Sequence, residues 1–128
     1  MTTNGESNLR KAAREDARPT ADSVNCPVET TLAVIGGKWK PLILWRLKSG
    51  VRRFGELQRL VPGVTRKMLT QHLRELERDG IVARKVYGEV PLKVEYSLTE
   101  YGRTLRPLLK ELCDWGHTHE KRVAAGQG

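Results

Sequence analysis

The stretch TRKMLTQHLRELER, residues 65–78, has the spacing of an amphipathic helix with a basic outer face. At about 100° per residue, leucines recurring at i, i+4 and i+7 fall on one apolar stripe. The opposite stripe carries cations and an amide, which are the groups that reach phosphates and base edges in a DNA major groove. The apolar stripe comprises Leu69, Leu73 and Leu76, and the opposite stripe comprises Lys67, Gln71, Arg74 and Arg78. The pattern therefore predicts a DNA-recognition helix.

The residues on either side of this stretch strengthen the prediction. Residues 61–64, Val-Pro-Gly-Val, have the composition of a turn that follows a helix over residues 54–60. Thr65 is suited to cap the recognition helix through its hydroxyl, and Gly80 is suited to end it. Two helices joined by a short turn that contains glycine are typical of a helix-turn-helix.

The periodicity changes from helical to two after Gly80. Residues 82–87 and 93–98 alternate apolar and polar side chains around a turn, which predicts a hairpin with one buried face. A hairpin directly after a helix-turn-helix is a wing, so the arrangement predicts a winged helix.

Three further elements complete the prediction. A helix begins after Pro27 and ends at Gly36-Gly37, and a second helix covers residues 39–47. A short strand is expected at residues 51–53, and a final helix begins near Thr99. The expected fold class is α+β, mainly helical: a winged helix-turn-helix with N- and C-terminal dimerisation helices. We expect a disordered N-terminal arm at residues 1–24, the winged-helix domain at 25–121 and a flexible tail at 122–128.

The final helix carries an apolar stripe with spacings of 4, 3, 4 and 3, which resembles a heptad pattern. This stripe is longer than a wing domain can bury alone, so it predicts a homodimer. Such a dimer would place two recognition helices about one DNA turn, or about 34–36 Å, apart. The candidate interface residues are those of the stripe, Tyr101, Leu105, Leu108, Leu112 and Trp115, together with Val28 and Leu32 in the first helix.

Charge points to a polyanionic partner. The chain has 128 residues and a formal net charge of +8. Residues 38–67 contain nine basic residues and one acid, so the net charge of this segment is nine minus one, or +8. The segment alone therefore accounts for the net charge of the chain. Such a concentration favours nucleic acid as the partner, although a solvated basic face is the alternative. There is no apolar run long enough to span a bilayer and no signal-like start, so a cytoplasmic protein without a membrane partner is expected.

Several motifs, in the same order along residues 26–116, resemble the HxlR-type transcriptional regulators. They are Cys26-Pro27, Gly36-Gly37-Lys38-Trp39, Leu42-Ile43-Leu44, Arg53-Phe54-Gly55-Glu56-Leu57, residues 69–80 (LTQHLRELERDG), residues 94–99 (VEYSLT) and Trp115-Gly116. The resemblance implies a MarR-like bacterial winged-helix regulator that binds a pseudo-palindromic operator as a homodimer and lies on the nucleoid when bound. Lys40-Pro41 departs from the pattern of many members and could shift the start of the second helix.

The candidate DNA contacts fall into three groups. Base contacts are expected near the start of the recognition helix, and a phosphate contact is expected at its cap. The other contacts are expected from the wing and from the short strand before the helix-turn-helix. The base contacts are Arg66, Lys67, Thr70, Gln71 and Arg74. Thr65 is the phosphate contact at the cap, Arg52 and Arg53 are the contacts from the short strand, and Arg84, Lys85 and Lys93 are those from the wing. The alternative for Arg74 and Arg78 is ion pairing with Glu75, Glu77 or Asp79, and for the wing cations a solvated strand face.

Cys26 is a candidate redox sensor because it lies at the start of a helix, where the dipole favours a thiolate. The family resemblance implies the same role, since some members sense quinones, aldehydes or hypochlorite through a cysteine at this position. Cys113 is a candidate partner thiol across the dimer. The alternatives are a buried apolar thiol for Cys26 and a plain interface residue for Cys113.

The sequence does not favour an enzyme. It has no nucleophile–base constellation, and Gly36-Gly37-Lys38 lacks the spacing of a phosphate loop. Cys113 and His117 make only a weak case for a metal site, so no metal and no cofactor are expected. The leading interpretation is a sequence-specific transcription regulator, expected to be a repressor, that binds double-stranded DNA and responds to an oxidant or electrophile. The alternatives are an architectural DNA binder without sequence preference and a winged helix that binds an acidic protein.

Overall fold

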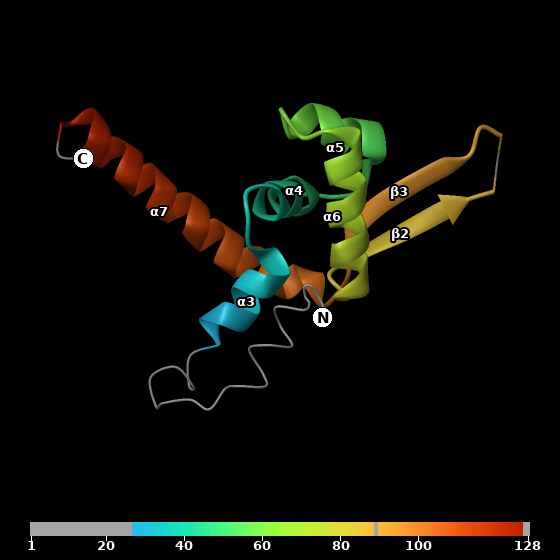
Figure 1. Cartoon of the computed structure of the whole chain (residues 1–128), viewed down its shortest axis with the longest axis horizontal. Helices are drawn as coiled ribbons and strands as arrows, with labels where there is room; N and C mark the ends of the chain where they lie inside the picture. Colours follow the sequence, from blue (N-terminus) through green and yellow to red (C-terminus); the bar gives the residue numbers. More distant parts are fainter. Residues whose placement is uncertain (1–26, 89, 127–128) are drawn as a thin grey trace. The chain divides into compact units, whose positions relative to one another are not determined.

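The computed structural model describes residues 27–88 and 90–126. The elements follow in the order α3, α4, β1, α5, α6, β2, β3, η1 and α7 (Figure 1). This order confirms the predicted sequence of helices, short strand, helix-turn-helix, hairpin and long helix. None of these helices is long and apolar enough to cross a membrane within the described residues.

Helix α3 (Val28–Ile35) begins directly after Pro27. Its end is set by Gly36, whose N–H donates to the carbonyl of Leu32 at 2.8 Å, and by Gly37, whose φ of 87° is left-handed. Both boundaries confirm the sequence prediction. Val28 and Leu32 are exposed.

Helix α4 (Trp39–Leu47) has the predicted bounds, and Lys40-Pro41 does not shift its start. Ile43, Leu44 and Leu47 are fully buried, whereas Leu42 is exposed. Residues at i, i+1 and i+4 share a helix face, whereas Leu42 lies about 100° outside it.

Helices α5 (Phe54–Leu60) and α6 (Arg66–Arg78) form the helix-turn-helix with the predicted bounds. All three leucines of the apolar stripe of α6 have exposed fractions of 1% or less. Gly80 ends α6 in a left-handed conformation, with its N–H on the carbonyl of Glu77 at 2.9 Å. The N–H of Ile81 bonds to the carbonyl of Leu76 at 2.9 Å, which completes a Schellman motif.

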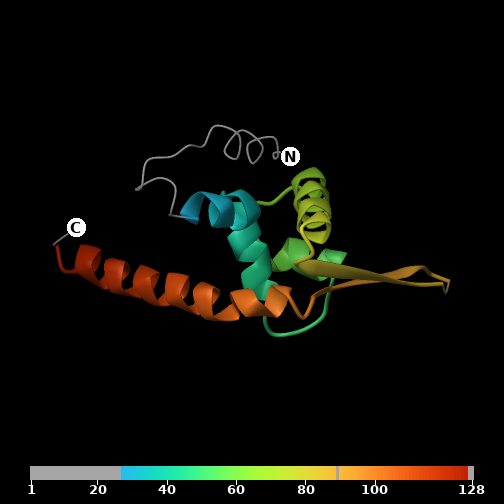
Figure 2. The same ribbon diagram turned by 90° about the horizontal axis from the view of Figure 1, so that it is seen from below.

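The wing is a three-stranded antiparallel sheet in the order β1-β3-β2. Strand β1 (Arg52–Arg53) pairs with β3 (Lys93–Leu98), which also pairs with β2 (Val82–Tyr87). One face was expected to be buried along the whole hairpin, and this is wrong for its outer half. Val82, Tyr96 and Leu98 are buried at the base, but Val86 is 47% exposed. The outer half of the hairpin extends beyond α5 and α6, so these two helices do not cover it (Figure 2).

The C-terminal helix begins later than predicted. A 3-10 turn, η1 (Gly102–Leu105), precedes α7 (Arg106–Ala124). The hydroxyl of Thr99 donates to the carbonyl of Gly80 at 2.7 Å and accepts from the N–H of Gly102 at 2.8 Å. These bonds tie the turn to the end of α6, and Pro107 then suits the first turn of α7.

The predicted domain boundaries remain predictions. The arm over residues 1–24 lies outside the described residues, and α7 runs past residue 121 to Ala124.

Candidate nucleic-acid interface

The outer face of α6 gathers the predicted base contacts on one open surface. Thr70 and Glu75 are half-buried on this face, and the cations and the amide around them are exposed. An open depression is lined by Arg66, Lys67, Thr70, Gln71, Arg74, Glu75 and Arg78. At the start of the helix, the hydroxyl of Thr65 accepts from the N–H of Met68 at 3.1 Å, so the predicted cap is present.

The cations on this face differ in their partners. The guanidinium of Arg66 lies 5.0 Å from the centre of the Phe54 ring. Nε of Arg78 is 3.8 Å from Oδ1 of Asp79, which is the ion pair that the sequence analysis gave as its alternative. Among the described residues, Lys67 and Arg74 make no ion pair. These two charges are therefore the ones most available to an outside anion.

The amide of Gln71 is oriented by an acid one turn along the helix. Its Nε2 donates to Oε2 of Glu75 at 3.2 Å. The other carboxylate oxygen of Glu75 is 3.6 Å from Nδ1 of His72. From the sequence, Glu75 was expected only as an ion-pair partner for Arg74 or Arg78, and its contact with the amide was missed.

The base of the wing is joined to α6 by an ion pair. Nε of Arg84 lies 3.4 Å from Oε1 of Glu77. The neighbouring Tyr96 is buried, and burial raises the pKa of its hydroxyl. The charge of Glu77 raises this pKa further, whereas Arg84 and Arg74 lower it. Arg84 is thus engaged with the protein, although it was predicted as a DNA contact.

Farther along the wing, two cations share one aromatic ring. The ammonium groups of Lys85 and Lys93 lie 5.0 and 4.7 Å from the centre of the Tyr87 ring. The hydroxyl of Tyr87 donates to Oε1 of Glu95 at 3.0 Å. Register explains the grouping, because Tyr87 pairs with Lys93 and Lys85 pairs with Glu95. The two lysines are therefore held together on one face of the wing.

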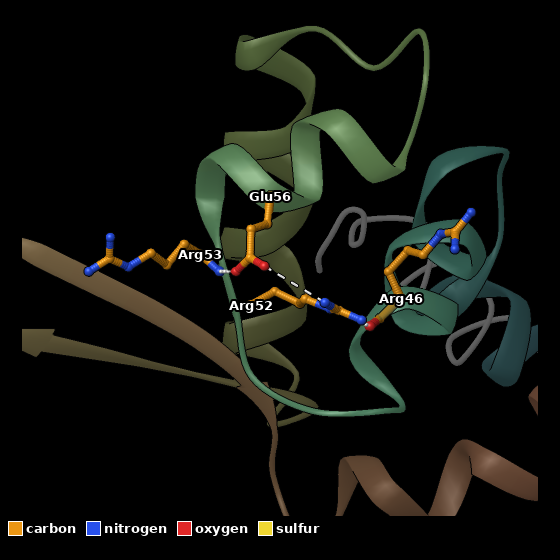
Figure 3. Close-up of polar contacts among 4 residues, drawn as sticks. All are labelled: Arg46, Arg52, Arg53 and Glu56. Carbon is orange, nitrogen blue, oxygen red and sulfur yellow. Dashed lines mark hydrogen bonds and ion pairs between the residues drawn. The ribbon is translucent and has the colours of Figure 1, made fainter.

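The adjacent arginines of β1 have different environments, as Figure 3 shows. Nε of Arg52 donates to the carbonyl of Arg46 at 3.2 Å, and its Nη1 lies 3.7 Å from Oε2 of Glu56. Arg53 uses only its backbone N–H, which donates to Oε1 of Glu56 at 2.9 Å. Its exposed side chain points away from these groups (Figure 3).

Of the two candidate thiols, only that of Cys113 lies within the described residues. Cys113 is a half-buried free thiol on α7, whereas Cys26 lies outside the described residues.

The candidate dimer residues are largely exposed. Trp115 is 67% exposed, and its ring stacks on His119 with 5.2 Å between centroids. Val28, Leu32, Tyr101 and Leu112 are exposed, and Leu105 and Leu108 are half-buried.

This surface, a capped basic helix beside a wing, agrees with what comparison with known families finds. Residues 34–124 match the family model described as HxlR-like helix-turn-helix. The chain belongs to the HxlR-like helix-turn-helix family. The resemblance predicted from the motifs is therefore confirmed, and the family implies DNA binding.

Relatives of this HxlR-like chain are described as transcription regulators. The HTH-type transcriptional regulator YdeP of Bacillus subtilis (strain 168) is 55% identical over 102 residues, covering 80% of this chain and 80% of that protein. The chain is thus a transcriptional regulator of the helix-turn-helix type, which is the class expected from the sequence in place of an enzyme.

Solved structures of similar proteins share its winged-helix fold. The redox regulator HypR in its oxidized form is 56% identical with a TM-score of 0.70, covering 73% of this chain and 96% of that one. The diamide-treated YodB from B. subtilis is 38% identical with a TM-score of 0.63, covering 74% of this chain and 95% of that one.

Proposed function

We propose that this HxlR-like protein is a sequence-specific regulator that reads the DNA major groove with α6. The observation that carries the proposal is the outer face of α6, where Lys67, Gln71 and Arg74 are exposed while the opposite leucines are buried. A glutamine amide can pair with adenine, and arginine or lysine can pair with the acceptors of guanine. A basic surface alone would bind any DNA, but this face also carries an amide that can discriminate between bases.

Contacts to the DNA backbone would set the position of α6 in the groove. The start of α6, capped by Thr65, has N–H groups and a helix dipole that favour a phosphate. Arg53, Lys85 and Lys93 carry charges that can reach flanking phosphates or the minor groove. Arg52 and Arg84, each in contact with an acid of the chain, would instead support the fold of the interface.

We further propose a homodimer that binds a pseudo-palindromic operator. Leu112 and Trp115 on α7 are 50% and 67% exposed, in line with the half-buried Leu105 and Leu108. An apolar stripe of this length costs free energy in water and is covered when a second copy packs against it. Operator binding by such a dimer would block transcription, so the expected role is repression.

The proposed input is oxidation of thiols by an oxidant or electrophile. The support is the similarity to HypR and YodB, which were solved in oxidized and diamide-treated forms. When diamide oxidises two thiols, the thiols lose two electrons and two protons and form a disulfide. Diamide takes up these electrons and protons and becomes the hydrazine. Cys26 and Cys113 are the candidate thiols, because they are the two cysteines of the chain.

The test compares binding of the full-length protein to the intergenic DNA upstream of its own gene with binding to random DNA of equal length. We expect the upstream DNA to bind at least about a thousandfold more tightly at physiological salt. Equal affinities would support an architectural binder. Binding to neither DNA at low salt would support a protein-interaction winged helix.

A second arm of the same experiment tests the thiol input. Diamide should release the wild-type protein from the upstream DNA, and the variant Cys26→Ser should remain bound. Release of both proteins would contradict a role for Cys26, and retention of both would contradict the thiol input altogether.

A further inference from the structure

Glu75 places a negative charge on the outer face of α6, the surface that the proposed function turns toward DNA. It is the one acid among the residues that line the open depression on this face, with Arg66, Lys67, Arg74 and Arg78 around it. A carboxylate facing a polyanion weakens binding to every DNA sequence, because like charges repel. The charge of Glu75 therefore does not add to DNA affinity.

The carboxylate of Glu75 lies close to two side chains of the preceding turn, and it makes a hydrogen bond to one of them. Its Oε2 accepts from Nε2 of Gln71 at 3.2 Å, and its Oε1 lies 3.6 Å from Nδ1 of His72. The side chains of His72 and Glu75 are 22% and 27% exposed, so the acid is partly enclosed by the helix surface. Spacings of i, i+3 and i+4 place all three residues on neighbouring turns.

This arrangement fixes which way round the amide of Gln71 lies. An ionised carboxylate only accepts hydrogen bonds, so it attracts the NH₂ group of the amide and repels its carbonyl oxygen. One N–H of Gln71 is used by Glu75, which leaves the second N–H and the oxygen Oε1 for a ligand. Adenine offers N7 as an acceptor and its amino group as a donor, in a fixed order along the major-groove edge. A preset amide matches that order without a search over rotamers.

We propose that Glu75 is a specificity-determining positioning residue, which orients the Gln71 amide toward one base at the expense of general DNA affinity. The inference rests on the proposed function, in which Gln71 contacts a base. Glu75 itself does not touch DNA in this account and acts through Gln71.

The experiment uses the full-length protein and a duplex library with a randomised central segment. The wild-type protein first selects its preferred sequence, and dissociation constants are then measured for that sequence, for each single base-pair substitution and for random DNA. The same set is measured for Gln71→Ala, Glu75→Ala and the double variant. Glu120→Ala is the matched control, because Glu120 also sits three residues after a histidine, with Oε1 3.7 Å from Nδ1 of His117, but lies on α7.

The expected result for Glu75→Ala has two opposite parts. At one base pair, the ratio of the dissociation constants for the substituted and the preferred sequence should fall by roughly tenfold, as expected for the loss of one bidentate base contact. This should be the same base pair at which Gln71→Ala lowers the ratio. Binding to random DNA should become roughly twofold tighter, because a negative charge facing the phosphates is gone. The double variant should lose no further discrimination at that base pair, and Glu120→Ala should lose none.

Unchanged ratios at every base pair, with all dissociation constants shifted together, would overturn the inference and leave Glu75 as a charge only. If thermal unfolding shows that Glu75→Ala is not folded, Glu75→Gln gives the same test, since it keeps the side-chain volume and removes the fixed order of donor and acceptor. Retained discrimination in Glu75→Gln, despite tighter binding to random DNA, would also overturn it. Failure of the wild-type protein to select any sequence would instead refute the proposed function, before any variant is compared.

Discussion

Thr65 illustrates how one side chain sets the start of α6. Its hydroxyl oxygen accepts from the N–H of Met68, one of the donors at the start of α6 that have no partner within the helix. Thr65→Ala should therefore lower the free energy of unfolding by about 1 kcal/mol, and Thr65→Ser should preserve it. Urea denaturation followed by circular dichroism measures the difference.

Thr118 provides the control for this prediction. Its hydroxyl donates to the carbonyl of Asp114 within α7, where the backbone already has its helical bonds. Thr118→Ala should change the free energy of unfolding by less than about 0.5 kcal/mol. Equal losses in Thr65→Ala and Thr118→Ala would contradict the capping role.

Arg52 and Arg53 make a sharp comparison because they are neighbours with the same charge. Arg53→Gln should reduce the slope of log binding constant against log salt by about one for each subunit, as the loss of one phosphate contact does. Arg52→Gln should leave the slope nearly unchanged, because its guanidinium is already bound to the carbonyl of Arg46 and lies near Glu56. Fluorescence anisotropy over a range of salt concentrations gives both slopes, and equal reductions would refute the distinction.

The sequence could place candidate residues at this scale but could not separate their roles. Spacing put Lys67, Gln71 and Arg74 on the outer face of α6, because helical periodicity is a local property. It could not tell Arg52 from Arg53, because the difference lies in the contacts that the guanidinium of Arg52 makes in the folded chain. These contacts are with the carbonyl of Arg46 and with the carboxylate of Glu56. The contact between Gln71 and Glu75 is within one turn, so the i, i+4 spacing was a signal that could have revealed it.

At the scale of elements, the boundaries that local chemistry sets were predicted well. The bounds of α4, α5 and α6 agree with the sequence prediction, and Gly37 and Gly80 stop helices as expected. Burial of the wing was predicted less well. Alternation indicates which strand face is apolar, but it does not reveal how far the neighbouring helices extend to cover that face. The 3-10 turn before α7 was also missed, because it depends on Thr99 bonding back to the end of α6.

Helix α7 is the element on which the proposed dimer depends. Leu112→Lys places a charge in the exposed apolar stripe and should convert the dimer to a monomer, because a buried charge without a partner is costly. His117→Lys is the control, because position 117 lies on the other side of α7, about 140° from Leu112, and the lysine can keep the contact with Glu120. Sedimentation equilibrium measures both masses. A dimer for Leu112→Lys would contradict the proposed interface.

For the whole molecule, the net positive charge and the motifs of the HxlR-like family both indicated DNA binding from the sequence. The net charge of +8 lies within residues 38–67, a stretch that runs into the start of α6. Such a field attracts DNA of any sequence and, under the proposed function, brings the outer face of α6 close to it. The operator itself could not be predicted, because discrimination among bases depends on a few side-chain contacts and on the spacing of two subunits.

A hydroxyl-radical footprint of the full-length protein on its upstream intergenic DNA tests whether α6 reads the DNA sequence. We expect protection of two short segments with related sequences, centred about 10–10.5 base pairs, or one helical turn, apart. The variant combining Gln71→Ala and Arg74→Ala should lose both segments together while still binding DNA at low salt. Uniform protection without a fixed position, or the same footprint for that variant, would contradict sequence reading by α6.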